Sequence, residues 1–166
     1  MDNTAQEKIV NILKEKFESE ILSVEAPYNF LTVNLKKEQI IDIIRYLYNH
    51  EEARFQYLTT LCGIHYPETN QIAIMYQLHS LENNWRIRLK IFLSADNPVT
   101  PTLNTLFSAA NWMERETYDF YGVKFTGHPD LRRILNVEDM IIFPMRKEYP
   151  LEDQTREDKK DFMFGR

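Results

Sequence analysis

The sequence predicts an α+β fold, in which helices cover a mixed β-sheet and an extended arm follows at the C-terminus. The chain has 166 residues and 43% of them are hydrophobic, which is enough to bury one core. Apolar residues recur at helical spacing in some segments and alternate with polar residues in others. Residues 127–166 are rich in charge and show neither pattern. We therefore assign residues 1–126 to an α+β core domain and residues 127–166 to the arm.

The first half of the core is predicted to contain two helices with two strands between them. A helix over residues 4–18 has apolar side chains every three or four positions, namely Ile9, Ile12, Leu13 and Phe17. Two short strands over 20–26 and 30–35 follow. A helix over 37–49 comes next, and its predicted buried stripe is Ile40, Ile41, Ile44, Leu47 and Tyr48.

Three further strands are predicted. Residues 55–62 show little alternation, which favours a central place in a sheet. Residues 71–80 and 85–93 are predicted to form a hairpin around a polar turn. The last of these strands has one apolar face and one basic face, the basic one made by Arg86, Arg88 and Lys90.

The last predicted helix begins with Thr100 as its cap and Pro101 as its first residue. Gly122 is a suitable stop, because glycine adopts the left-handed conformation that ends many helices. The pattern leaves open whether this is one helix or two that meet near Phe107.

Composition excludes several classes of function. A net charge of −5 argues against non-specific nucleic-acid binding and against a polybasic membrane anchor. The one cysteine, Cys62, cannot form an internal disulfide or supply an iron–sulfur cluster, and we expect it to be a buried small hydrophobe. The N-terminus lacks a signal-peptide pattern and no apolar run could span a bilayer, so the protein is predicted to be cytoplasmic.

The densest chemistry lies between residues 112 and 150, where charged and aromatic side chains are interleaved. Glu114, Arg115 and Glu116 could form a solvated helix face with ordinary ion pairs. They could equally belong to a contact surface, because arginine and aromatic residues are enriched at interface centres. We favour the second interpretation, in which the arginines find carboxylates on a companion polypeptide.

His128 lies in a turn, Gly127-His-Pro-Asp, without a second histidine or cysteine nearby, so we expect a structural or interface role for it and no metal. The chain contains no glycine-rich phosphate loop and no nucleophile elbow. Binding of a nucleotide or flavin by this chain alone is therefore not expected.

Three blocks in this region, residues 111–125, 127–135 and 143–150, resemble the signature of the C subunit of NADH–quinone oxidoreductase, the 30-kDa subunit family of respiratory complex I. The resemblance implies a non-catalytic scaffold or assembly subunit of the peripheral arm. It would dock on the D subunit, which holds the quinone site and resembles a hydrogenase large subunit, and on the B subunit, which holds the terminal cluster.

The resemblance also implies that this chain has no catalytic, cofactor-binding or metal-binding residues, and that FMN and the iron–sulfur clusters lie in other subunits. The complex would be peripheral on the cytoplasmic side of the bacterial inner membrane and would translocate protons. The fold-fixing and docking positions carried over are Glu114, Arg115, Glu116, Asp119, His128, Arg132, Arg133, Arg146 and Lys147. Relatives often have an acidic residue near the position of His65, to which we assign no function.

Two alternatives stay open. The chain could be the equivalent subunit of a membrane-bound hydrogenase or of a ferredoxin-fed complex, because the electron donor binds elsewhere. More remotely, it could be a free-standing enzyme that uses Glu116 and His128 as an acid–base pair. The sequence reveals neither the quinone type nor the pumped ion.

Overall fold

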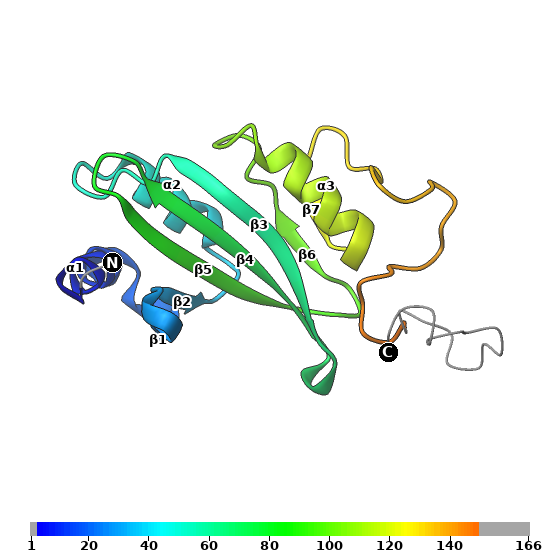
Figure 1. Ribbon diagram of the computed structural model, residues 1–166, viewed down its shortest axis with the longest axis horizontal. Helices are drawn as coiled ribbons and strands as arrows, with labels where there is room; N and C mark the ends of the chain where they lie inside the picture. The colour runs from blue at the N-terminus through cyan, green and yellow to red at the C-terminus, as the bar shows by residue number, and fades with distance from the viewer. Residues whose placement is uncertain (1–2, 150–166) are drawn as a thin grey trace, which may run out of the picture.

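A computed structural model describes residues 3–149 of the chain (Figure 1). Its centre is a five-stranded sheet with the strand order β1-β2-β5-β4-β3. Neighbouring strands are antiparallel except for β2 and β5, which are parallel. The strands are β1 (Ile21–Glu25), β2 (Thr32–Leu35), β3 (Tyr57–Tyr66), β4 (Gln71–Ser80) and β5 (Trp85–Ser94).

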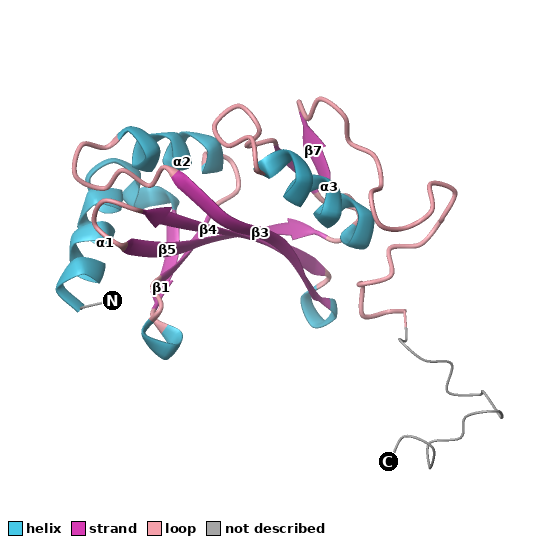
Figure 2. Ribbon diagram, turned by 45° about the horizontal axis from the view of Figure 1, so that its top comes forward, coloured by secondary structure: helices cyan, strands magenta, loops and turns pink. Residues whose placement is uncertain are grey.

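Figure 2 shows that α2 and α3 lie on one face of this sheet and that α1 lies at its left-hand end. The helices are α1 (Asn3–Phe17), α2 (Ile40–Asn49) and α3 (Ala110–Tyr121). Short 3₁₀ turns precede β1 (Glu18–Glu20), separate β1 from β2 (Pro27–Asn29) and join β3 to β4 (Pro67–Thr69). A second, parallel pair consists of β6 (Val99–Pro101) and β7 (Lys124–Thr126).

One hydrophobic core joins the helices to the covered face of the sheet. The stripe predicted for the first helix is confirmed, since Ile9, Ile12, Leu13 and Phe17 are all buried. In α2 the stripe is shifted, with Ile43 buried in place of Ile41. The predicted α+β class with a mixed sheet is confirmed.

The predicted central place of residues 55–62 is wrong, because β3 is an edge strand and continues to Tyr66. One face of this strand is covered by α3, whose Tyr121 ring lies so close to Gly63 that an added Cβ would be 2.7 Å from it. The apolar character of this strand thus reflects contact with a helix. In β5, the predicted division into an apolar and a basic face is confirmed, since Ile87, Leu89 and Ile91 are buried and the basic residues are not.

The predicted helix start at Thr100 and Pro101 is also wrong, because both residues belong to β6. The N–H of Thr102 donates to the carbonyl of Thr126 at 3.0 Å, so long-range pairing with β7 outweighs the local helix signal. A single helical turn follows at Leu103, and α3 itself begins at Ala110. The predicted stop at Gly122 is confirmed by its φ of 76°.

The predicted boundary after residue 126 coincides with the end of β7. Residues 150–166 of the predicted arm lie outside the described residues. Within residues 3–149, no helix has both the length and the apolar character needed to span a membrane.

Candidate functional site

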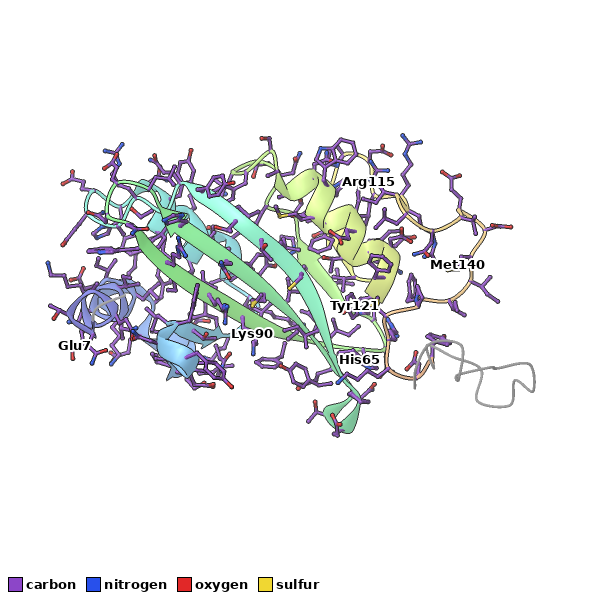
Figure 3. All side chains as sticks on the ribbon, viewed as in Figure 1. Glu7, His65, Lys90, Arg115, Tyr121 and Met140 are labelled. Carbon is purple, nitrogen blue, oxygen red and sulfur yellow. The ribbon has the colours of Figure 1, made fainter. Side chains whose placement is uncertain are left out.

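The candidate site consists of helix α3 and residues 127–149, which we call the arm segment. The arm segment leaves β7, passes the C-terminal end of α3 and reaches the end of β3 (Figure 1). In Figure 3, Arg115 and Tyr121 mark α3, Met140 marks the arm segment and His65 marks the end of β3.

Asp119, near the C-terminal end of α3, binds the arm segment through both carboxylate oxygens. Its Oδ2 accepts hydrogen bonds from the backbone N–H groups of Ile134, Leu135 and Asn136 at 3.1, 2.8 and 3.0 Å. Burial alone would raise the pKa of Asp119, but these hydrogen bonds and those of Arg133 and the Asn136 side chain outweigh it, so the pKa is well below its ordinary value. Asp119 is therefore a fixed, buried anion.

Arg133 carries the matching positive charge. Its Nη1 lies 2.7 Å from Asp119 Oδ1 and 2.8 Å from the Asp119 carbonyl oxygen, and its side chain is 5% exposed. Its Nη2 donates to the carbonyl oxygens of Met140 and Ile142 at 2.7 and 2.9 Å. The guanidinium group of Arg133 thus joins the end of α3 to a later part of the arm segment, residues 140–142.

Phe143 lies close to two guanidinium groups. The Cζ atoms of Arg133 and Arg146 are 5.1 and 5.2 Å from its ring centroid, and the ring of Tyr118 meets it edge-on. A Cβ at Gly122 would be 2.5 Å from the Phe143 ring. Gly122 therefore both ends α3 and makes room for this ring.

The far end of the arm segment is attached to α3 and to β3. Arg146 Nε donates to the Tyr121 carbonyl oxygen at 2.8 Å. The backbone N–H of Lys147 donates to Nδ1 of His65 at 3.0 Å, although the two residues are 82 positions apart in the chain. His65 is buried, so this contact fixes the arm segment to the edge of the main sheet.

Glu114 is fully buried at the other end of the site. Its carboxylate accepts hydrogen bonds from Thr102 Oγ1 at 2.5 Å and from the Leu103 N–H at 2.7 Å. Burial raises the pKa of Glu114, and these hydrogen bonds offset only part of that increase. Glu114 thus holds the loop between β6 and α3 in place.

His128 fixes the start of the arm segment. Its Nδ1 accepts from the Asp130 N–H at 3.0 Å, so Nε2 carries the proton and donates to the Asn111 carbonyl oxygen at 3.1 Å. Nε2 also lies 4.0 Å from Glu114 Oε2, and both side chains are completely buried. Both ring nitrogens are occupied, which leaves none for a substrate.

Arg115 has no carboxylate within ion-pair distance in the described part of the chain. Its Nε and Nη2 donate to the carbonyl oxygens of Arg132 and Arg133 at 3.1 and 3.2 Å, and its Cζ lies 5.2 Å from the Trp112 ring. This buried charge is therefore stabilised by peptide dipoles and by an aromatic face.

The remaining predicted positions are exposed. Arg132 pairs with Asp130 at 2.9 Å, and both are at least half exposed. Lys147 and Glu116 are also exposed. Glu116 borders a groove of about 410 Å³ between α3 and β3.

Cys62 also lines this groove, so it is half-buried and not fully buried as expected. Burial raises the pKa of the Cys62 thiol and nearby Glu116 raises it further, which opposes formation of a reactive thiolate.

Large apolar side chains project from the arm segment into solvent. Their exposed fractions are 65% for Leu135, 64% for Val137, 94% for Ile141 and 48% for Met145. Trp112 on α3 is also 62% exposed. Scattered exposed apolar residues are ordinary, but four along one anchored segment indicate a contact surface.

These contacts correct one expectation from the sequence. The arginines are expected to find acceptors on a companion polypeptide, but Arg133 finds a carboxylate and Arg115 finds carbonyl groups within this chain. The physical reason is proximity, since the arm segment folds back on α3. Sequence reasoning also missed Phe143 and His65 as anchors, and only Phe143 had a signal, its place beside Arg146 in the third block.

The described residues offer no evident metal site. Within residues 3–149, no group of three or more His, Cys, Asp or Glu side chains is arranged to hold a metal ion.

Comparison with known proteins identifies the family. A family model described as "Respiratory-chain NADH dehydrogenase, 30 Kd subunit" matches residues 33–155. The chain belongs to this family. The match covers α2, β3, β4, β5, α3 and the arm segment, so the predicted resemblance is confirmed.

Relatives of the 30-kDa subunit family agree. The C 2 subunit of NADH-quinone oxidoreductase in Rhizobium meliloti (strain 1021) is 40% identical over 136 residues, which is 81% of this chain and 74% of the relative. The C subunit of the same enzyme in Geotalea uraniireducens (strain Rf4) is 35% identical over 160 residues, or 96% of each chain.

Two solved structures share the fold. A trypsin-resistant fragment of Nqo5 matches with a TM-score of 0.63 and 25% identity, over 76% of this chain and 99% of the fragment. A chain of the membrane-bound sulfane sulfur reductase, an archaeal respiratory membrane complex, matches with a TM-score of 0.77 over 95% of this chain and 98% of that one. At 20% identity, this second likeness shows the fold alone.

Proposed function

We propose that this 30-kDa-family subunit is a non-catalytic scaffold of the peripheral arm of a proton-translocating NADH–quinone oxidoreductase. It docks on the quinone-site D subunit and the terminal-cluster B subunit, on the cytoplasmic side of the membrane. It carries no FMN, iron–sulfur cluster or metal of its own. Its task is to hold neighbouring subunits in register.

One observation carries the proposal. The arm segment is pinned from inside by the buried Asp119–Arg133 pair, while its large apolar side chains are left outside. A segment ordered by its own chain has already lost most of the conformational entropy that docking would otherwise cost. The buried charges fix the shape, and the exposed side chains supply the contact area.

The acid–base alternative has little support in the geometry. It pairs Glu116 with His128, but Glu116 is exposed at the groove and His128 is buried with both nitrogens engaged. A general base must reach the proton that it removes. We therefore keep the scaffold as the proposal.

The test is affinity capture of the tagged chain from solubilised native membranes, with identification of the polypeptides that accompany it. We expect the D and B subunits, together with a module that oxidises NADH. Capture with hydrogenase or ferredoxin-oxidising polypeptides would instead favour the alternative complexes. Recovery of the chain alone would overturn the scaffold proposal.

A pair of double variants tests the surface itself. Leu135→Ser with Ile141→Ser should reduce the recovery of the neighbours, because both side chains project from the arm segment. The matched control is Leu22→Ser with Leu81→Ser, which removes exposed leucines from β1 and from the β4–β5 turn. Equal recovery with both double variants would argue against the arm segment as the docking surface.

A further inference from the structure

A second surface of the molecule has the properties of an interface. It is the face of the sheet opposite α2 and α3 (Figure 2), and we call it the open sheet face. Within residues 3–149, neither α2 nor α3 covers it. The side chains that define it are half-buried. The residues that define it are Tyr66, Met75, Gln77, Arg88, Lys90 and Phe92.

Arg86, the third basic residue on this side of β5, is exposed near the start of the strand. The other two cations on this face, Arg88 and Lys90, are held by aromatic rings. Arg88 Cζ lies 3.9 Å from the centroid of the Phe30 ring. Lys90 (labelled in Figure 3) places Nζ 6.0 Å from the Tyr66 ring and 5.9 Å from the Phe92 ring. Each ring fixes the direction of a charge without neutralising it.

Neither cation has an acidic partner in the described part of the chain, since no ion pair joins Arg88 or Lys90 to a carboxylate there. Arg88 Nε donates to Gln77 Oε1 at 3.3 Å, and Lys90 Nζ donates to the Tyr66 hydroxyl at 3.5 Å. Glu25, in the edge strand β1, is held by the side chains of Asn34 and Ser23. Counting contacts within residues 3–149, the ammonium and guanidinium groups thus keep unused donors.

We propose that the open sheet face binds an acidic segment of a neighbouring subunit, with carboxylates that reach Arg88 and Lys90. This rests on the proposed function and adds a second contact to it. The two cations are alternate residues of β5, so they are separated by about 7 Å along the strand. An extended segment with acidic residues at alternate positions has the same spacing.

The chemistry favours protein over nucleic acid. Nucleic-acid binding depends on many cations that neutralise successive phosphates, whereas this chain has a net charge of −5 and this face presents two cations at its centre. Arginine with aromatic rings is also the composition of protein interface centres. With this face and the arm segment both engaged, the subunit bridges two surfaces instead of attaching by one.

The first experiment measures the reactivity of lysine side chains toward an amine-acetylating reagent, in the isolated full chain and in the native complex. We expect acetylation of Lys90 to fall at least tenfold in the complex, and that of exposed Lys14 on α1 to fall much less. An unchanged Lys90 in a complex that retains its neighbours would overturn this inference and leave the scaffold proposal standing. Protection removed by nuclease treatment would assign the face to nucleic acid and overturn it too.

The second experiment uses charge-matched variants. Arg88→Gln with Lys90→Gln removes two positive charges from the open sheet face, and Arg45→Gln with Lys124→Gln removes two from elsewhere. We expect the first pair to weaken the association of this chain with its neighbouring subunits about tenfold or more and to make that association less dependent on salt concentration. The control pair should leave both the affinity and its salt dependence unchanged. Equal behaviour of the two pairs contradicts the inference. Lys90 acetylation in the unaltered complex decides the matter if the first pair folds poorly.

Discussion

Asp119 and Arg133 form an ion pair inside the protein, with Oδ1 and Nη1 2.7 Å apart and neither side chain more than 5% exposed. The pair joins the last turn of α3 to the middle of the arm segment. Removing one member leaves a buried charge without its partner, which is far more costly than the net contribution of the pair itself.

We therefore expect Arg133→Ala to lower the free energy of unfolding by about 3–5 kcal/mol. The neighbouring Arg132→Ala removes an exposed ion pair and should cost about 1 kcal/mol or less. Urea unfolding of the isolated chain measures both. Similar values for the two variants would contradict the internal role of Arg133.

The depressed pKa of Asp119 predicts a loss of stability in acid. Above the ordinary value of 3.8, this group is ionised in both folded and unfolded chains. Below it, the unfolded chain binds a proton that the folded chain does not, so the free energy of unfolding decreases. Asp119→Asn should be less stable at neutral pH and should lose less stability below about pH 4. Unfolding curves at a series of pH values test this, and parallel profiles would refute it.

The raised pKa of Glu114 predicts the opposite pH dependence, in which the free energy of unfolding decreases as the pH rises. Its folded-state pKa is raised, so the unfolded chain ionises first as the pH rises above 4.5. The free energy of unfolding then falls until the pH passes the folded-state pKa. Glu114→Gln should remove this decrease, whereas Glu116→Gln, at an exposed position, should preserve it. The same pH series measures both variants.

Two glycines form a matched pair for the fit of Phe143. Gly122 and Gly127 both have a positive φ, of 76° and 82°, so alanine at either costs about 1–2 kcal/mol of backbone strain. An added Cβ at Gly127 meets only Thr102 at 3.4 Å, whereas at Gly122 it meets the Phe143 ring at 2.5 Å. Gly122→Ala should therefore destabilise the fold more and expose the arm segment to trypsin. Equal proteolysis of the two variants would show that Phe143 can move aside.

His65 should protect the amide of Lys147 from hydrogen exchange. His65→Ala removes the acceptor, so we expect faster exchange at Lys147 and a loss of about 1–3 kcal/mol in stability. His79→Ala is the control, because His79 contacts Asn84 in the turn between β4 and β5 and not the arm segment. Unchanged exchange at Lys147 would show that this contact does not hold the segment.

Residue spacing predicted the elements that depend on contacts between residues close together in the chain. The stripe of α1, the β4–β5 hairpin and the end of α3 at Gly122 all follow from spacing within a few residues. The strand β6 could not be found this way, because Thr100 and Pro101 look like a helix start and their partner strand is more than twenty residues further on. Long-range pairing decided the outcome.

In the candidate site too, the sequence revealed local features but not contacts between distant residues. The charged residues of this site were visible in the sequence, and so was the position of Glu114, Arg115, Glu116 and Asp119 on one helix. The sequence could not show which molecule supplies the acceptors, because Asp119 and Arg133 meet only when the arm segment folds back. His65 had no signal at all, since its role depends on a contact across 82 positions.

The parallel contact between β2 and β5 has a consequence for synthesis on the ribosome. During synthesis, β2, which ends at Leu35, emerges from the ribosome long before β5, which ends at Ser94. Until β5 has emerged, β2 can pair only with β1, and the apolar residues of β2 remain without the strand that they contact in the folded sheet. A ribosome-associated chaperone has its best opportunity to bind during this interval, before the sheet closes.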